Sequence, residues 1–105
     1  LSSRNEESDV NIPNSFKIHS VYPNPFNGKV KFDFSIETPQ LVTFNVYDIN
    51  GKMIVDELIM GGARGYHQIS WDGKNRYGDL VSSGVYYYTF TLQEKIVKGK
   101  LTYLK

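Results

Sequence analysis

The stretch Trp71-Asp-Gly-Lys-Asn-Arg-Tyr-Gly-Asp-Leu-Val-Ser-Ser-Gly-Val-Tyr-Tyr-Tyr88 is the part around which this chain is organised. Its first three residues end one strand and begin a turn. Residues 74–83 are polar and contain a glycine, which is typical of a loop. Gly84 then leads into the aromatic residues 86–88, which favour a second strand. A strand, a loop and another strand, without any helical spacing, indicate an all-β chain.

Alternating apolar and polar residues extend this pattern in both directions. Val30, Phe32, Phe34 and Ile36 are separated by polar side chains, as in a strand with one buried face. The pattern predicts seven strands, at residues 16–22, 29–37, 41–49, 52–58, 66–71, 84–93 and 96–104. Seven short strands in a chain of 105 residues predict an immunoglobulin-like β-sandwich of two antiparallel sheets.

Side chains on the inward face of each predicted strand are expected to form the core. They are Phe16, Ile18, Tyr22, Val30, Phe32, Phe34, Ile36, Val42, Phe44, Val46, His67, Ile69, Trp71, Tyr86, Tyr88, Phe90, Leu92, Val97, Leu101 and Tyr103. Asn45 is expected to point outward. Residues 52–58 fit two inward faces, Ile54 with Leu58 or Met53 with Val55.

Two short segments predict the connection between the third and fourth strands and the connection between the first and second strands. Asn50-Gly51 lies between two strand patterns and predicts a hairpin. Residues 22–28 contain two prolines, which remove N–H donors and favour extended or turn geometry. We therefore predict a rigid elbow there, with Tyr22 and Phe26 packed inward.

Composition limits the partners and the organisation of the chain. Its 105 residues are typical of one domain, and the formal net charge of +1 gives no reason to expect nucleic acid or an anionic membrane as partner. Cysteine is absent, and no apolar run approaches the ~20 residues that span a bilayer. Residues 1–15 are polar and charged, so we expect a flexible linker to an upstream domain, followed by a folded domain at 16–105.

No arrangement of catalytic residues stands out. Only His19 and His67 could act as a general base. His67 shares a strand face with apolar residues, so a core-edge histidine satisfied by a neighbour is the alternative to a catalytic one. Asp33 and Glu37 lie on the polar face of one strand, where solvation explains them better than the facing carboxylates of a glycosidase. We therefore predict that the chain is not an enzyme.

One loop offers oxygen ligands for a metal ion. Asp72, Asn75 and Asp79 are of the type that calcium binds. Their spacing is not that of an Asp-x-Asp-x-Asp-Gly loop, and Asp72 and Asn75 can instead cap turns through neighbouring backbone groups. We predict no bound metal and no cofactor.

Four tyrosines are expected on outward faces or in loops: Tyr47, Tyr66, Tyr77 and Tyr87. Several coplanar rings on one face would suit carbohydrate binding, whereas scattered tyrosines on a sandwich pack across strands. A non-catalytic module that binds carbohydrate or protein, attached to a secreted enzyme, is therefore an alternative function.

Five motifs follow one another along the chain. They are Tyr22-Pro-Asn-Pro-Phe-Asn27, Val46-Tyr-Asp-Ile-Asn-Gly-Lys-Met-Ile54, Gly65-Tyr-His-Gln-Ile-Ser-Trp-Asp-Gly73, Val81-Ser-Ser-Gly-Val-Tyr-Tyr-Tyr88 after Gly78, and Lys98-Gly-Lys-Leu-Thr-Tyr-Leu-Lys105. Together they closely resemble the type A C-terminal sorting domain of proteins exported by the type IX secretion system. They are also similar to the immunoglobulin-like domain of the flagellar hook-capping protein, so an assembly domain of that kind is a further alternative. The resemblance covers residues 16–105.

The resemblance to sorting domains implies a non-catalytic secretion signal. Such a domain folds in the periplasm, is recognised by the outer-membrane type IX translocon and is usually removed by a sortase-like peptidase. It directs a cargo protein, here joined ahead of residues 1–15, to the cell surface or the medium.

The last strand is the first candidate for recognition, because an edge strand can add to a partner sheet. The recognition residues that we predict are Lys98, Lys100, Leu101, Tyr103, Leu104, Lys105, Gly84 and Tyr86. Each motif residue can also serve the fold alone, as when Gly84 lets the chain enter its strand or Trp71 fills the core.

Overall fold

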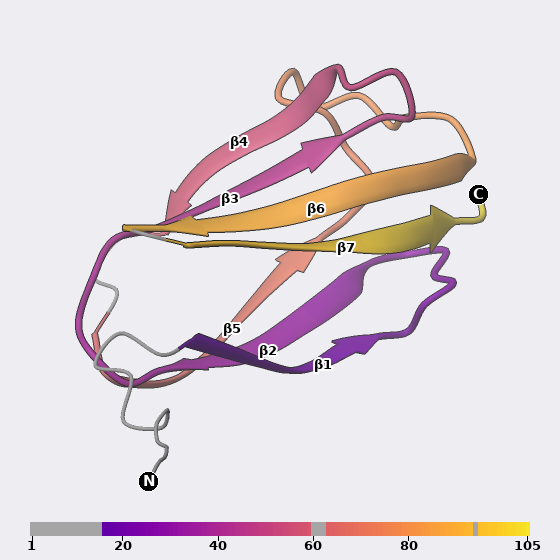
Figure 1. Cartoon of the computed structure of the whole chain (residues 1–105). Coiled ribbons are helices and arrows are strands. Elements are labelled where there is room, and N and C mark those ends of the chain that lie inside the picture. The colour runs from indigo at the N-terminus through magenta and orange to yellow at the C-terminus, as the bar shows by residue number, and fades with distance from the viewer. Residues whose placement is uncertain (1–15, 60–62, 94) are drawn as a thin grey trace, which may run out of the picture.

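Over the residues that the structure describes, the protein is an all-β sandwich of seven strands, as the sequence predicts (Figure 1). The computed structural model describes residues 16–59, 63–93 and 95–105, so the predicted linker at 1–15 lies outside the described residues. The strands are β1 (Phe16–Tyr22), β2 (Val30–Ile36), β3 (Val42–Tyr47), β4 (Met53–Ile59), β5 (Gly65–Trp71), β6 (Gly84–Leu92) and β7 (Lys95–Tyr103). Within the described part, the structure contains no helix of the length and hydrophobicity that crossing a membrane requires.

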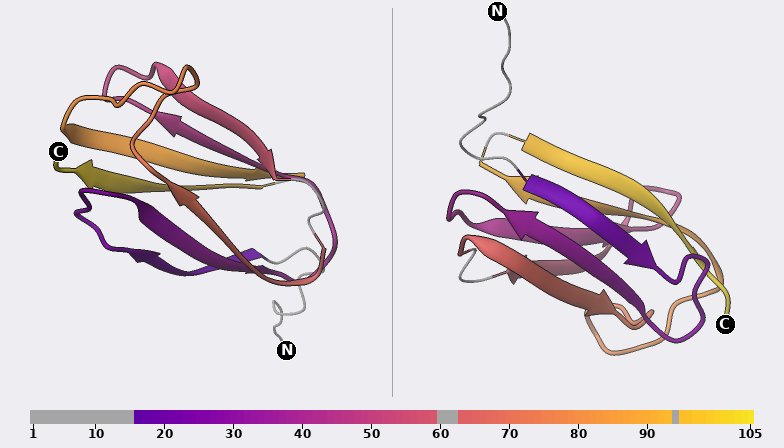
Figure 2. Two further views of the ribbon diagram at one scale, coloured as in Figure 1. Left: turned by 180° about the vertical axis from the view of Figure 1, so that it is seen from behind. Right: turned by 90° about the horizontal axis from the view of Figure 1, so that it is seen from below.

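Two antiparallel sheets face each other. One has the strand order β1-β2-β5 and the other has the order β4-β3-β6-β7. The edge strands β1 and β7 lie on the same side of the sandwich, and β5 and β4 lie on the opposite side (Figure 2). This arrangement places the N-terminal and C-terminal strands of the sandwich next to each other.

Aromatic rings from both sheets fill the core. The ring of Phe90, on β6, is fully buried. Its centroid lies 5.2–5.9 Å from those of Phe16, Phe32, Phe34, Phe44 and Tyr88. The inward residues predicted for β2, β3 and β6 are all buried, because strict alternation sends every second side chain to the same face.

The prediction that Tyr22 is buried is wrong, because its side chain is 44% exposed. The register of β1 shifts between Ile18 and Ser20, so that Val21 pairs with Phe32 of β2. This irregularity reverses the alternation in the second half of β1. Val21 therefore packs against the core, and Tyr22 turns away from it.

Strands β3 and β4 also differ in detail from the simple pattern. Asn45 points away from the core, as predicted, yet it is only 6% exposed. Its amide donates hydrogen bonds to the Asp56 carboxylate at 3.1 Å and to the Val55 carbonyl at 3.4 Å, which satisfies the buried group. On β4, Ile54 and Val55 both pack against the core, so both alternative faces contribute.

The predicted hairpin between β3 and β4 is present. Gly51 adopts φ +84°, a conformation that glycine reaches without strain. The Gly51 N–H donates to the Asp48 carbonyl at 3.0 Å, and the Asp48 carboxylate accepts the N–H groups of Asn50 and Lys52 at 2.9 Å. Asp48 thus organises the turn that Asn50-Gly51 permits.

Candidate functional site

The predicted recognition residues gather on and around β7, at the edge of the four-stranded sheet. β7 pairs with β6, and β6 separates it from the rest of the sheet, which confirms the edge position expected for the last strand. Lys98 and Lys100 are exposed. Leu101 and Tyr103 face the core, with 0% and 2% of their surface exposed. The lysines are therefore available for contact, whereas Leu101 and Tyr103 hold the strand in place.

The elbow between β1 and β2, residues 22–28, covers the C-terminal half of the β7 edge. The Asn24 amide donates to the Lys100 carbonyl at 3.0 Å, and its oxygen accepts the Thr102 N–H at 3.1 Å. The Phe26 N–H donates to the Thr102 carbonyl at 3.0 Å, and the Phe26 carbonyl accepts the Leu104 N–H at 2.8 Å. The elbow therefore pairs with β7 much as a short additional strand would.

The end of the chain is held from a second side. The Lys105 N–H donates to the Ser83 hydroxyl at 2.8 Å, while the Leu104 side chain is 51% exposed. Gly84 pairs with Tyr103 and adopts φ +156°. Residues 104 and 105 thus present surface side chains from a backbone that is fixed on both sides.

Tyr86 supports this end of the sandwich from the core. It is 6% exposed, and its hydroxyl donates to the Ser82 carbonyl at 2.6 Å. Burial and, to a smaller extent, the nearby Asp48 carboxylate raise the pKa of the Tyr86 hydroxyl. Tyr86 is therefore a neutral donor that positions the segment before β6, and it lies too deep to contact a partner directly.

Rings from four of the five motifs meet beneath the elbow. The Phe26 ring stacks on Tyr103 at a centroid distance of 4.9 Å and lies 5.6 Å from Trp71, which in turn contacts Tyr86 at 5.5 Å. A side chain at Gly73 would overlap the Tyr103 ring. The Trp71 indole N–H donates to the Lys74 carbonyl at 2.9 Å and fixes the start of the following loop.

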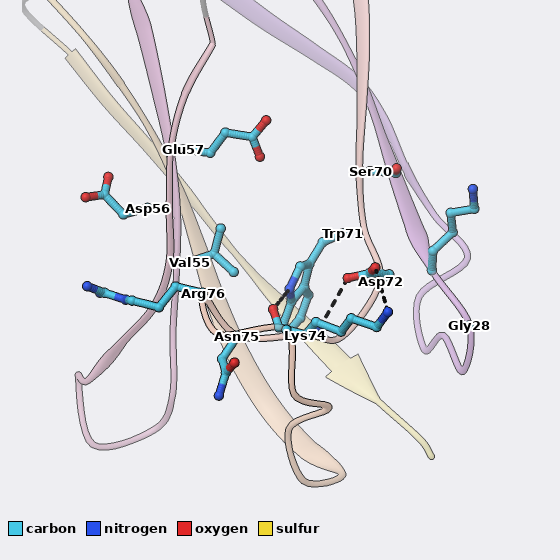
Figure 3. A pocket seen from close by; sticks show the side chains of 12 residues that line it. Gly28, Val55, Asp56, Glu57, Ser70, Trp71, Asp72, Lys74, Asn75 and Arg76 are labelled. Carbon is cyan, nitrogen blue, oxygen red and sulfur yellow. Dashed lines mark hydrogen bonds and ion pairs between the residues drawn. The ribbon is translucent and has the colours of Figure 1, made fainter.

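A groove of about 780 Å³ lies between β4 and residues 72–78, and Gly28 of the elbow and Trp71 also line it (Figure 3). Asp56 and Glu57 line it from β4, and Lys74 and Arg76 line it from the loop. The Lys74 ammonium lies 3.9 Å from the Asp72 carboxylate. The groove is therefore lined by carboxylates from β4 and by side chains of both charges from the loop.

The loop residues considered for calcium make turn contacts. The Asp72 carboxylate accepts the Lys74 N–H at 3.3 Å. The Asn75 side chain accepts the N–H groups of Tyr77 and Asp79 at 2.9 and 3.1 Å. This confirms the capping interpretation of Asp72 and Asn75. Among the described residues, no three His, Cys, Asp or Glu side chains are placed to share a metal ion.

The two histidines lie in structural environments. The Nε2 atom of His67 is 2.6 Å from the Ala63 carbonyl, and its ring stacks on Phe34, as expected for a core-edge histidine. His19 is exposed, with Nε2 2.8 Å from the Ser35 hydroxyl. Nearby, a hydrogen bond from Gln68 and, to a smaller extent, one from Ser20 lower the pKa of the Asp33 carboxyl. Asp33 is thus a charged acceptor that links β1, β2 and β5.

The four tyrosines considered for carbohydrate binding do not form one row. Tyr47 and Tyr87 are cross-strand neighbours on β3 and β6, beside Lys98 and Lys100. Tyr66 lies on the other sheet, with its ring 5.4 Å from that of His19, and Tyr77 lies in the loop. Only one pair of rings therefore shares a face.

Fold and site together define a small β-sandwich that presents a fixed terminal segment beside an edge strand. The family model of the secretion system C-terminal sorting domain matches residues 20–103, and the chain belongs to this family. The protein is thus a sorting signal for type IX secretion that directs a cargo protein to the cell surface or the extracellular space. Domains of this family are non-catalytic and are recognised by the secretion machinery.

Solved structures support the fold. The dimeric latent PorU from Porphyromonas gingivalis matches 92% of this chain with a TM-score of 0.71 and 18% identity, although the match spans 10% of the PorU chain. FlgD from Xanthomonas campestris, whose structure gives insights into the hook capping essential for flagellar assembly, matches 85% of this chain and 65% of its own with a TM-score of 0.57 and 23% identity.

A third structure shares the sandwich as well. The alkylpurine DNA glycosylase AlkC from Pseudomonas fluorescens, bound to DNA with an abasic site analogue, matches 86% of this chain and 30% of its own, with a TM-score of 0.56 and 14% identity. No curated protein sequence gives a significant match. The type IX resemblance and the all-β fold inferred from the sequence are confirmed.

Sequence analysis did not assign Asn24 and Ser83 to the site. Asn24 contacts residues on β7 that are 76 and 78 positions away, and Ser83 contacts Lys105 across 22 positions. No local pattern could reveal these contacts. The only indication in the sequence was that Asn24 lies between two prolines, in a segment that cannot form the regular hydrogen bonds of a β-strand.

Proposed function

We propose that the outer-membrane type IX translocon recognises the surface formed by Lys98, Lys100, Leu104 and Lys105. The observation that supports this proposal is that the elbow and Ser83 fix the backbone from Lys100 to Lys105, while Lys98 is held by its pairing with β6. A segment whose backbone is already ordered loses little conformational entropy on binding, so recognition of its exposed side chains is favoured.

The remaining predicted residues have a positioning role in this proposal. Leu101, Tyr103 and Tyr86 are almost fully buried, and Gly84 allows the backbone conformation at the start of β6. They determine where the exposed lysines lie. We also propose that the domain folds in the periplasm, that residues 1–15 join it to an upstream cargo, that a sortase-like peptidase removes it after export, and that it carries no enzymatic activity itself.

A fusion assay tests the recognition surface. A fluorescent protein is placed ahead of residues 1–105 and expressed in a host with a working type IX system. Deletion of the whole of β7 would be uninformative, because it would remove Leu101 and Tyr103 from the core. The test variant is therefore the double substitution Lys98→Glu and Lys100→Glu, which changes two exposed side chains.

We expect at least about tenfold less fluorescent protein in the medium, because about 1.4 kcal/mol of lost recognition changes an equilibrium tenfold. The matched control is Lys29→Glu with Lys52→Glu, which makes the same charge change at two other exposed lysines. Thermal unfolding of each variant checks the fold. Normal export of the test variant, or equal loss in the control, would contradict the proposal.

A further inference from the structure

The outer edge of β7 is divided into two parts. In an antiparallel strand, successive residues direct their backbone groups alternately to the two sides. The Lys100 carbonyl, both backbone groups of Thr102 and the Leu104 N–H point to the outer side, where the elbow binds all of them. Residues 100–104, which we call the closed half, therefore have little capacity to pair with another strand.

The same alternation places the N–H and C=O groups of Ile96 and Lys98 on the outer side. Outside the sheets, no backbone hydrogen bond within the described residues involves either of them. The elbow does not extend this far, since its last contact toward the start of β7 is with the Lys100 carbonyl. Residues 95–98, the open half, thus offer a short free edge beside a closed one.

Side chains give the open half a distinct character. Lys95 and Lys98 of the open half and Lys100 just beyond it are exposed, and in the described part of the chain none of them forms an ion pair. The Ile96 side chain is 59% exposed. Lysines on an edge disfavour pairing with a second copy of the same strand, because like charges would lie opposite each other. A strand with acidic side chains would find complementary charge.

We propose that the open half of β7 is the docking edge for an extended acidic segment of a partner protein, which adds to the four-stranded sheet as a fifth strand. This inference rests on the proposed function, since it assigns a binding mode to the surface around Lys98 and Lys100. Backbone pairing with Ile96 and Lys98 supplies the geometry, and acidic side chains on the partner pair with the lysines.

The elbow gives the docked strand a defined register. A partner strand that extends beyond Lys98 meets backbone groups that Asn24 and Phe26 already occupy. Pairing is therefore limited to about four residues. A strand this short gives weak binding, which suits a signal that has to be released after export.

A peptide titration tests the edge directly. The probe is the capped peptide Glu-Val-Glu-Val-Glu-Val-Glu, added to the ¹⁵N-labelled 105-residue chain and followed by NMR. We expect the Ile96 and Lys98 amides to shift and to exchange more slowly with solvent, while the Thr102 amide does not change. Added salt weakens the effect, because the attraction is between exposed charges.

Two comparisons define the outcome of the titration. The Lys98→Glu variant should bind the peptide about fivefold more weakly than the parent chain, and Lys17→Glu, at an exposed lysine on β1, should bind as the parent does. Unchanged Ile96 and Lys98 amides at millimolar peptide would overturn the proposal. Equal binding by a peptide with Lys in place of Glu would overturn it too.

Export of Ile96→Pro provides a second test. Proline removes the outward N–H that a partner strand needs but no bond of the β6–β7 ladder, and edge strands accept it where the N–H faces solvent. Ile96→Thr is the control, since it shortens the apolar side chain and keeps the N–H. We expect export to fall about tenfold for the proline variant and to stay near normal for threonine.

The two proposals fail in different ways. Normal export of folded Ile96→Pro, together with loss of export in the Lys98 and Lys100 double variant, would overturn strand addition and leave the recognition surface intact. Normal export of the double variant would overturn the recognition surface itself. If Ile96→Pro does not fold, the peptide titration on the parent chain still decides for or against the docking edge.

Discussion

Gly99 of β7 has no side chain, and the ring of Tyr88 occupies the space where one would lie. Gly99 pairs with Tyr88 across the β6–β7 ladder, and an added Cβ would overlap the Tyr88 hydroxyl and ring. Tyr88 cannot move away easily, because its ring centroid lies 5.0 Å from that of Phe32 and its side chain is 8% exposed. Burial also raises the pKa of the Tyr88 hydroxyl, so the group stays neutral.

We therefore predict that Gly99→Ala lowers the free energy of unfolding by about 1–3 kcal/mol, as overpacked core substitutions do. The control is Gly28→Ala, because an added Cβ at Gly28 meets no atom within 4 Å. That variant should stay within about 0.5 kcal/mol of the parent. Urea unfolding measures both, and equal effects at the two glycines would show that the Tyr88 contact is unimportant.

At the scale of elements, the elbow and β7 form one unit. The elbow is too rich in proline to form a regular strand, yet the Asn24 side chain supplies both a donor and an acceptor to the β7 edge. The amide side chain of Asn24 thus makes hydrogen bonds of the kind that backbone groups make in a strand, next to prolines that lack the N–H donor. The motif around residues 22–27 thus has a structural role at the C-terminal strand, far from its own place in the sequence.

Asn24→Ala should lower the free energy of unfolding by about 1–2 kcal/mol, because it removes two hydrogen bonds, each contributing about 0.5–1.5 kcal/mol. The Thr102 amide should also exchange about tenfold faster with solvent, which NMR can measure. Asn27→Ala removes an exposed neighbour of the same type and serves as the control. Unchanged Thr102 exchange in Asn24→Ala would show that the elbow does not protect β7.

At the scale of the whole molecule, one aromatic core joins the two sheets. Phe90 alone contacts rings on β1, β2, β3 and β6. Neither sheet can keep its apolar face buried without the other, so both should unfold together. The position of the exposed residues on β7 therefore depends on strands of both sheets.

Phe90→Ala should therefore lower the free energy of unfolding by about 3–5 kcal/mol, a large part of the 5–15 kcal/mol typical of a domain. The far-ultraviolet signal of the strands and the near-ultraviolet signal of Trp71 should change at the same urea concentration in the parent and in the variant. Separate transitions would show that the two sheets are independent units.

Much of the fold followed from local pattern. The alternation in β2, β3 and β6 predicted which residues are buried, because a strand of period two sends alternate side chains to one face. The pattern misplaced Tyr22, since a single register shift in β1 reverses the alternation and leaves no mark in the residue types. Leu101 and Tyr103 were predicted as recognition residues together with the exposed lysines. A sequence motif does not distinguish a residue that contacts a partner from one that supports the fold.

Residues close together in the chain were enough to predict the strands, the inward faces of β2, β3 and β6, the hairpin at Asn50-Gly51 and the family. The three-dimensional arrangement was needed to show that the elbow closes half of the β7 edge, while the backbone of Ile96 and Lys98 has no partner on that edge among the described residues. That arrangement depends on contacts such as the one between Asn24 and Lys100, 76 residues apart. Pairings over such separations arise from how the two sheets stack, and no local pattern of residue types encodes them.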